Sequence, residues 1–141
     1  MQFPDVRKAT EAVIEVMNRG VGIRMFLFAP PVLLLSNEQQ TECVELLDNV
    51  SMSALNKYGK LSGRDWAEKD SLFFKFQGPS KRALQETAEI VKKIVEKHGG
   101  TGFELARNDE DSEALWKDRR NAYAAGLTLI DGYKGIPTDV W

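Results

Sequence analysis

Residue types that usually carry out nucleophilic, acid–base or metal chemistry are scarce in this sequence. It has one histidine, His98, and one cysteine, Cys43, in 141 residues. We find no Ser-His-Asp, Cys-His or histidine-rich metal constellation. No glycine-rich phosphate loop follows a predicted strand. The sequence therefore predicts no catalytic, cofactor-binding or metal-binding residue set within the chain.

The two single residues favour structural interpretations. His98 lies in the last turn of a predicted helix beside Lys97, where a basic side chain suits the negative end of the helix dipole. Cys43 begins a predicted strand that also carries Val44, Leu46 and Leu47, which predicts an inert buried thiol. A lone cysteine also excludes an internal disulfide.

Two adjacent arginines, Arg119 and Arg120, offer the one arrangement that could bind a substrate. They follow Trp116 on an amphipathic segment that also carries Asp111, Glu113 and Asp118. One interpretation is a solvated charged face with ion pairs worth about 0.2–0.5 kcal/mol each. The other is an inward arginine that binds a carboxylate with two parallel hydrogen bonds, which lysine cannot imitate. On the residues alone, the charged face is favoured.

Composition excludes several partners. The net charge of −2 gives no reason to expect nucleic acid or an anionic membrane surface. The longest apolar run, Phe26–Leu35, is broken by Pro30 and Pro31 and is about half of the ~20 residues that a membrane span needs. We expect no membrane span, and the first residues do not resemble a secretory signal.

The first half of the chain alternates helix and strand signals. A helix is predicted from Asp5 to Arg19, with an apolar stripe of Val6, Ala9, Val13 and Met17. A strand is predicted over 43–47. Asp48 then caps a helix that Gly59 ends, and a polar loop follows over 60–70.

The second half repeats the alternation. A strand is predicted over 71–77, and Ser80 caps a long helix that ends at Lys97. The predicted core face of this helix comprises Leu84, Ala88, Val91 and Val95, widened by Ala83, Thr87, Ile90 and Ile94. A short strand over 103–106 and a helix from 110 to about 125 follow. With residues 1–3 as the end of another strand, the pattern predicts an α+β fold with helices on one face of a sheet.

Several motifs, in the right order, resemble one family. They are Gln2–Ala9, Cys43–Asp48 with Asn56–Tyr58, Leu72–Gly78, His98–Gly100, Leu115–Trp116 with Arg119, Asn121 and Ala122, and Lys134–Gly135 with Thr138–Val140. Together they resemble the cytochrome-linked, FAD-dependent D-lactate dehydrogenases, within the FAD-linked 2-hydroxyacid oxidases. Apart from about 25–42, the likeness covers nearly the whole chain.

The resemblance implies a function that the residues alone do not. It implies a ferredoxin-like cap domain with an antiparallel sheet, beside a separate FAD-binding domain that is absent here. The full-length enzyme oxidises a D-2-hydroxy acid to the 2-oxo acid through FAD and passes electrons to cytochrome c. It also implies a mitochondrial location and leaves room for a divalent metal in the full-length enzyme.

The resemblance assigns one residue a role in this chain. Arg119 matches the arginine that holds the substrate carboxylate. Two further family contacts do not carry over, because Tyr123 and Pro137 stand at those positions. The family's metal-binding and proton-abstracting histidines match positions beyond residue 141.

Two departures from the family suggest a faulty gene model. Relatives run from the equivalent of residues 21–23 almost directly into Cys43, whereas about 25–42 intervene here. Codons for 23–26 and 41–42 can contain a splice donor and acceptor, and Trp141 can be the start of a second retained intron. We hypothesise two unspliced introns, and we expect 25–42 to be poorly packed and outside the core sheet.

Two functions remain open at this stage. The chain is either the substrate side of a D-lactate dehydrogenase, expected to be inactive alone, or a stand-alone ferredoxin-like module that binds a small ligand or a protein. A sheet that starts and ends in unfinished strands is incomplete at both ends, which favours the fragment.

Overall fold

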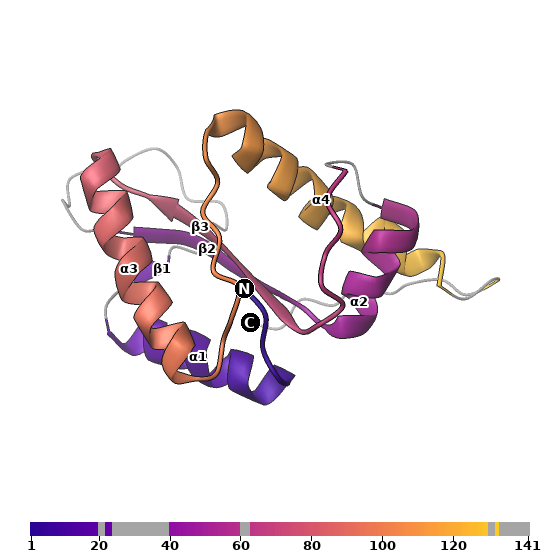
Figure 1. The fold of residues 1–141 in the computed structure, drawn as a ribbon, viewed down its shortest axis with the longest axis horizontal. Helices are drawn as coiled ribbons and strands as arrows, with labels where there is room; N and C mark the ends of the chain where they lie inside the picture. Colours follow the sequence, from indigo (N-terminus) through magenta and orange to yellow (C-terminus); the bar gives the residue numbers. More distant parts are fainter. Residues whose placement is uncertain (20–21, 24–39, 60–62, 130–131, 133–141) are drawn as a thin grey trace, which may run out of the picture. The chain divides into compact units, whose positions relative to one another are not determined.

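The computed structural model describes residues 1–19, 22–23, 40–59, 63–129 and 132 (Figure 1). The chain forms two compact units, each made of two separate stretches. The first comprises Met1–Leu46 with Asp70–Phe103, and the second Leu47–Lys69 with Glu104–Trp141. The described residues form both helices and strands, as predicted for an α+β fold.

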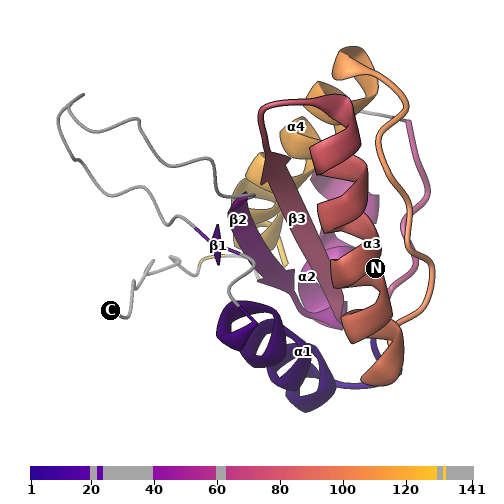
Figure 2. The same cartoon turned by 90° about the vertical axis from the view of Figure 1, so that its left-hand side faces the viewer.

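The first unit is built on a small sheet. Its strands are β1 (Gly22–Ile23), β2 (Gln40–Leu47) and β3 (Ser71–Gln77), in the order β1-β2-β3. β1 pairs with β2 in parallel, whereas β2 and β3 run in opposite directions (Figure 2). The predicted strand 71–77 is therefore confirmed, and the strand predicted over 43–47 begins three residues earlier.

The start of the chain extends this pairing. Gln2 forms antiparallel bridges to both Ser71 and Thr101. Its N–H donates to the Thr101 carbonyl at 2.9 Å, and the Thr101 N–H donates back to the Gln2 carbonyl at 2.8 Å. The prediction that residues 1–3 end a strand is confirmed at Gln2.

Two helices cover one face of this sheet, α1 (Val6–Asn18) and α3 (Lys81–Lys97). The side chains of Asp5 and Ser80 accept hydrogen bonds from the first turns of these helices, so both predicted starts are confirmed. The helices pack on alternate residues of β3 and on Phe3. The buried cluster comprises Phe3, Ala9, Ala12, Val16, Leu72, Val91, Ile94 and Val95.

The predicted core faces of these helices need correction. Val6 and Met17 of α1 are 42% and 55% exposed, whereas Ala12 and Val16 are fully buried. On α3, Ile90 is 40% exposed although it was placed on the core face. Apolar residues occupy more than one side of α1, and its packing against α3 selects the side that carries the small alanines.

The second unit is helical in its described part. It contains α2 (Asn49–Ala54), the π-helical segment η1 (Leu55–Gly59) and α4 (Asp109–Leu127). Asp48 caps α2 through a hydrogen bond to the Ser51 N–H, so the predicted helix from Asp48 to Gly59 is confirmed. Its last turn widens from α- to π-helical geometry. The buried apolar residues of this unit are Met52, Ala54, Leu55, Ala122 and Ala125.

Two predictions about strands are wrong. Residues 103–106 have no regular structure, because Gly102 has a φ of +64° and turns the chain after its single bridge at Thr101. Residues 40–42, the end of the segment expected to lie outside the sheet, belong to β2, and Gln40 and Thr41 pair with β1. Residues 24–39, 60–62 and Trp141 lie outside the described residues.

Candidate functional site

The helix α4 carries both arginines singled out by the sequence. Its inner face is formed by Asp118, Ala122 and Ala125, spaced four and then three residues apart, and all three are buried. Arg120 lies on the outer face and pairs with Glu113 at 2.6 Å. The interpretation as a charged solvated face therefore holds for Arg120.

Arg119 occupies a different position on α4. It is half-buried and follows Asp118, so it lies at the edge of the inner face, with its Nε atom buried. An arginine so placed can pack its aliphatic stem while its guanidinium reaches a ligand. The structure describes Tyr123, four residues further along the helix, as exposed, and Pro137 lies outside the described residues.

Asp118 is fully buried, with 0% of its surface exposed. Its Oδ2 accepts a hydrogen bond from the indole Nε1–H of Trp66 at 2.9 Å. The backbone of Trp66 is held by the side chain of Asn56, which donates to its carbonyl at 2.8 Å and accepts from its N–H at 3.0 Å. Sequence reasoning missed this arrangement, because nothing local relates Trp66 to α4.

The start of α4 is held by a second polar cluster. Asp111 accepts hydrogen bonds from the backbone N–H of Arg107, at 3.0 Å, and from the side chains of Arg107 and Arg64. Arg64 also lies 3.6 Å from a carboxylate oxygen of Glu104. The bonds from Arg107 first, then from Arg64, lower the pKa of Asp111 to about 2. The loop after η1 is thus attached to α4 at both Asp111 and Asp118.

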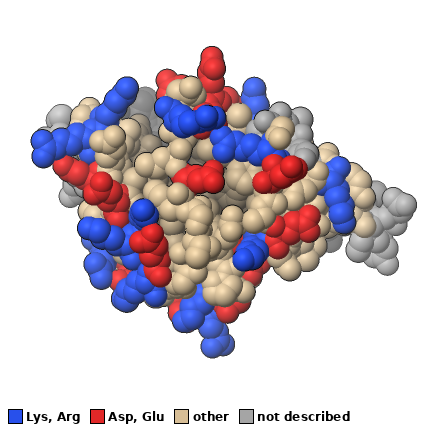
Figure 3. Space-filling model, in the orientation of Figure 1, with Lys and Arg blue, Asp and Glu red and all other residues tan. Residues whose placement is uncertain are grey.

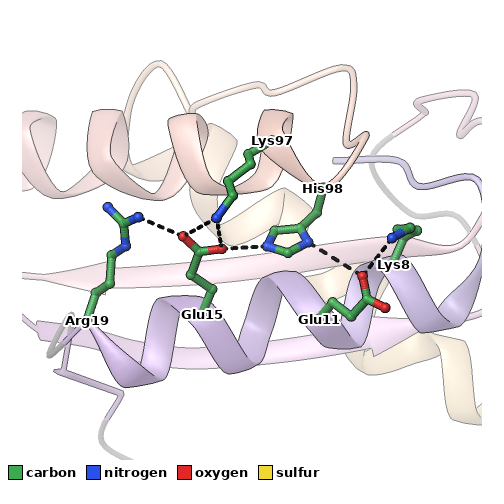
Figure 4. A network of polar contacts seen from close by, with 6 residues as sticks. All are labelled: Lys8, Glu11, Glu15, Arg19, Lys97 and His98. Atoms are coloured by element: carbon green, nitrogen blue, oxygen red, sulfur yellow. Dashed lines mark hydrogen bonds and ion pairs between the residues drawn. The ribbon is translucent and has the colours of Figure 1, made fainter.

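His98 belongs to an ion-pair network between α1 and α3 (Figure 4). Its Nε2 lies 2.7 Å from Glu15 Oε2, and its Nδ1 lies 3.7 Å from Glu11 Oε2. Lys97 and Arg19 each donate to Glu15 at 2.8 Å. Hydrogen bonds from Lys97 and then His98 lower the pKa of Glu15 to about 2. This is the structural role expected for a histidine at the end of a helix.

Cys43 departs from its prediction in one respect. It is half-buried on β2, and its Sγ donates to Glu45 Oε1 at 3.3 Å. The thiol is therefore less enclosed than predicted, because successive side chains of a strand point to opposite faces, and Cys43 shares its face with the charged Glu45.

Neither a metal site nor a membrane span emerges from the described part of the chain. No group of three or more histidine, cysteine, aspartate or glutamate residues there could hold a metal ion. No helix in the same residues combines the length and apolarity needed to cross a membrane. On the face drawn in Figure 3, basic and acidic side chains are interspersed.

The comparisons with known proteins define the class first. The family described as FAD linked oxidases, C-terminal domain, matches residues 31–140. This match covers most of the chain, including α4. The chain belongs to this family of C-terminal domains.

Within that class, the similar proteins share one name. A probable mitochondrial D-lactate dehydrogenase of Danio rerio is 30% identical over 98% of this chain and 23% of its own length. A mitochondrial D-lactate dehydrogenase (cytochrome) of Kluyveromyces lactis is 35% identical over 72% of this chain and 18% of its length. The mitochondrial D-lactate dehydrogenase (cytochrome) of Arabidopsis thaliana is 30% identical over 98% of this chain and 20% of its own length. The chain spans about a fifth of the length of these relatives.

The described residues do not fit the FAD that the family implies. A dinucleotide is usually held by a glycine-rich turn whose N–H groups meet its phosphates at a helix N-terminus. Here the helices begin after Asp5, Asp48, Ser80 or Asn108, and each of these side chains accepts a hydrogen bond from its own helix. Each cap takes up one of the first N–H groups of its helix, and two of the caps are carboxylates, which repel a phosphate.

Proposed function

We propose that this chain is the substrate-side cap domain of a mitochondrial, FAD-dependent D-lactate dehydrogenase. The enzyme oxidises D-lactate or a related D-2-hydroxy acid to the 2-oxo acid and passes the electrons to cytochrome c. The observation that carries this proposal is the family match over residues 31–140, together with relatives that are named D-lactate dehydrogenases. FAD is bound mainly by a separate domain.

The sheet of the first unit supports a ferredoxin-like topology for this cap. Gln2 lies between Ser71 and Thr101 in two antiparallel bridges, and β3 pairs with β2. Read across the sheet, the order is Thr101, Gln2, β3, β2. A ferredoxin-like βαββαβ domain pairs its strands in this order, with both helices on one face.

Arg119 holds the substrate carboxylate in this proposal. Its guanidinium can donate two parallel hydrogen bonds to the two carboxylate oxygens, which fixes the orientation of the hydroxyl-bearing carbon. Two features support the assignment: Arg119 lies at the edge of the inner face of α4, and the residue is half-buried with its Nε atom buried. The contribution of this chain is thus binding and orientation.

Turnover requires groups that the described residues do not supply. The single histidine, His98, is engaged by Glu15 and Glu11 between α1 and α3. We therefore expect the isolated 141-residue chain to bind a 2-hydroxy acid weakly and not to oxidise it.

The test is a titration of the ¹⁵N-labelled chain with D-lactate, followed by NMR. We expect amide shifts in α4 with a dissociation constant of about 1 mM. Arg119→Lys should weaken binding about tenfold, since a charge-assisted hydrogen bond is worth roughly 1.5 kcal/mol. The matched control Arg120→Lys, one residue along the same helix, should bind like the unsubstituted chain.

Two results would overturn the proposal. If D-lactate shifts no signal in the unsubstituted chain, or if Arg119→Lys binds as well as Arg120→Lys, then Arg119 does not hold the carboxylate. Ligand binding that is independent of Arg119 would favour the stand-alone module. Bound flavin in the visible spectrum, or D-lactate-dependent dye reduction by this chain alone, would contradict its restriction to the substrate side.

A further inference from the structure

Asp118 is the one charged side chain that is fully buried among the described residues. Removing a carboxylate from water is costly, and replacing a buried ion pair as a whole by apolar residues of similar volume is often neutral or stabilising. Fold stability alone therefore gives a weak reason for a carboxylate at this position. Its place directly before Arg119 suggests a reason connected with that arginine.

The partner of Asp118 is held unusually firmly. Trp66 is fixed at three atoms: its indole Nε1–H by Asp118, and its backbone N–H and carbonyl by the side chain of Asn56. Asn56 in turn lies in η1, the π-helical segment that packs against α4. A chain of hydrogen bonds, Asn56–Trp66–Asp118, thus joins η1, the following loop and the middle of α4. A π-helical segment of this kind is frequent at functional sites.

This chain of hydrogen bonds holds the middle of α4 at Asp118, while the bonds from Arg64 and Arg107 hold its start at Asp111. The inner face otherwise consists of Ala122 and Ala125, whose small side chains resist rotation little. The guanidinium of Arg119 lies roughly 8 Å from the helix axis, the ~2.3 Å helix radius plus the extended side chain. A rotation of about 10° would therefore move it by roughly 1.5 Å, enough to lose a bidentate contact.

We propose that the hydrogen bond between Trp66 and Asp118 positions Arg119 to bind the substrate carboxylate. Neither residue touches the substrate; both act through the orientation of α4. The inference rests on the proposed function, because it requires that Arg119 bind a carboxylate.

The experiment uses the 141-residue chain, D-lactate as the probe and NMR as the readout. Trp66→Phe removes the indole donor, and we expect D-lactate affinity to fall about tenfold. In an Arg119→Lys background the same substitution should have no further effect, since residues that act through one another are not additive. Trp116→Phe, a matched control on α4, should leave affinity within about twofold of the unsubstituted chain.

Substitutions of Asp118 keep the test decisive if Trp66→Phe fails to fold. Asp118→Asn retains an acceptor for the indole, so affinity should stay within about threefold. Asp118→Leu removes the acceptor of the Trp66 indole N–H and is bulkier than aspartate, so it should lower the melting temperature and lose about tenfold in affinity. The indole Nε1–H signal of Trp66 should move strongly in Asp118→Leu and little in Asp118→Asn.

The outcomes separate this inference from the function on which it rests. If Arg119→Lys weakens binding but Trp66→Phe and Asp118→Leu do not, the inference is wrong and the proposed function stands. If Trp66→Phe lowers D-lactate affinity equally in the unsubstituted chain and in the Arg119→Lys variant, Trp66 has a general structural role and the inference is also wrong. If the unsubstituted chain does not bind D-lactate, both fail.

Discussion

Replacing Gly100 by alanine should destabilise the first unit for a steric reason. Gly100 is buried just after α3, and its N–H donates to the Val95 carbonyl at 2.8 Å. A methyl group there would overlap Val95 Cγ1 and lie 2.9 Å from its carbonyl oxygen and 3.1 Å from Phe3 Cε1. Val95 and Phe3 are 0% and 2% exposed, so neither can move aside freely. Overpacking of this kind costs about 1–3 kcal/mol.

Gly126→Ala is the matched comparison. Gly126 lies inside α4, where no atom comes within 4 Å of an added methyl group, so alanine should stabilise by about 0.4–1 kcal/mol. Glycine-to-alanine substitution should therefore lower the free energy of unfolding at Gly100 and raise it at Gly126.

Urea unfolding of both variants measures the difference. Far-UV circular dichroism follows the whole chain, whereas tryptophan fluorescence reports on the second unit, which contains Trp66 and Trp116. We expect a lower circular dichroism midpoint for Gly100→Ala and a higher fluorescence midpoint for Gly126→Ala. A midpoint for Gly100→Ala equal to or above that of the unsubstituted chain would refute the steric reasoning.

Two further variants probe α1 and α3. The lowered pKa of Glu15 means that its ion pairs stabilise the fold above its ordinary pKa of 4.5, and that this contribution is lost as the pH falls towards about 2. Glu15→Gln should therefore flatten the acid dependence of the urea midpoint, and an unchanged acid slope would contradict this role. Ser80→Ala removes the cap of α3 and should cost about 1 kcal/mol in urea unfolding. Ser80→Asp, which restores an acceptor, should recover most of that loss.

Features set by neighbouring residues could be predicted from the sequence. The caps Asp48 and Ser80 and the helix start at Asp5 were predicted because each precedes a helical pattern, and each side chain accepts from a backbone N–H three residues on. The strand 71–77 was predicted because it is a short run rich in aromatic residues that is followed by the turn residues Gly78 and Pro79.

Features set by distant packing could not be predicted in this way. Apolar spacing on α1 fits more than one face, and only the contact with α3 selects Ala9, Ala12 and Val16. The strand expected over 103–106 fails because its pairing ends at Thr101.

The candidate site shows the same division. The arginine pair was visible in the sequence, but the choice of Arg119 came from a family resemblance and not from spacing. The inner face of α4 was hidden because it consists of small or polar residues, Asp118, Ala122 and Ala125. The hydrogen bond between Trp66 and Asp118 joins residues 52 positions apart, and no local sequence pattern predicts it.

The interleaving of the two units has a consequence for the order of folding. Residues 47–69 belong to the second unit but divide the first, and the first is complete only with residue 103. During synthesis, the backbone of Gln2 can therefore pair only after Thr101 has emerged from the ribosome, and α2 can pack against α4 only after α4 has emerged. Closing such long loops costs entropy before any contact compensates for it, which slows folding. Until then, the apolar faces of α1 and β3 stay exposed, which favours aggregation.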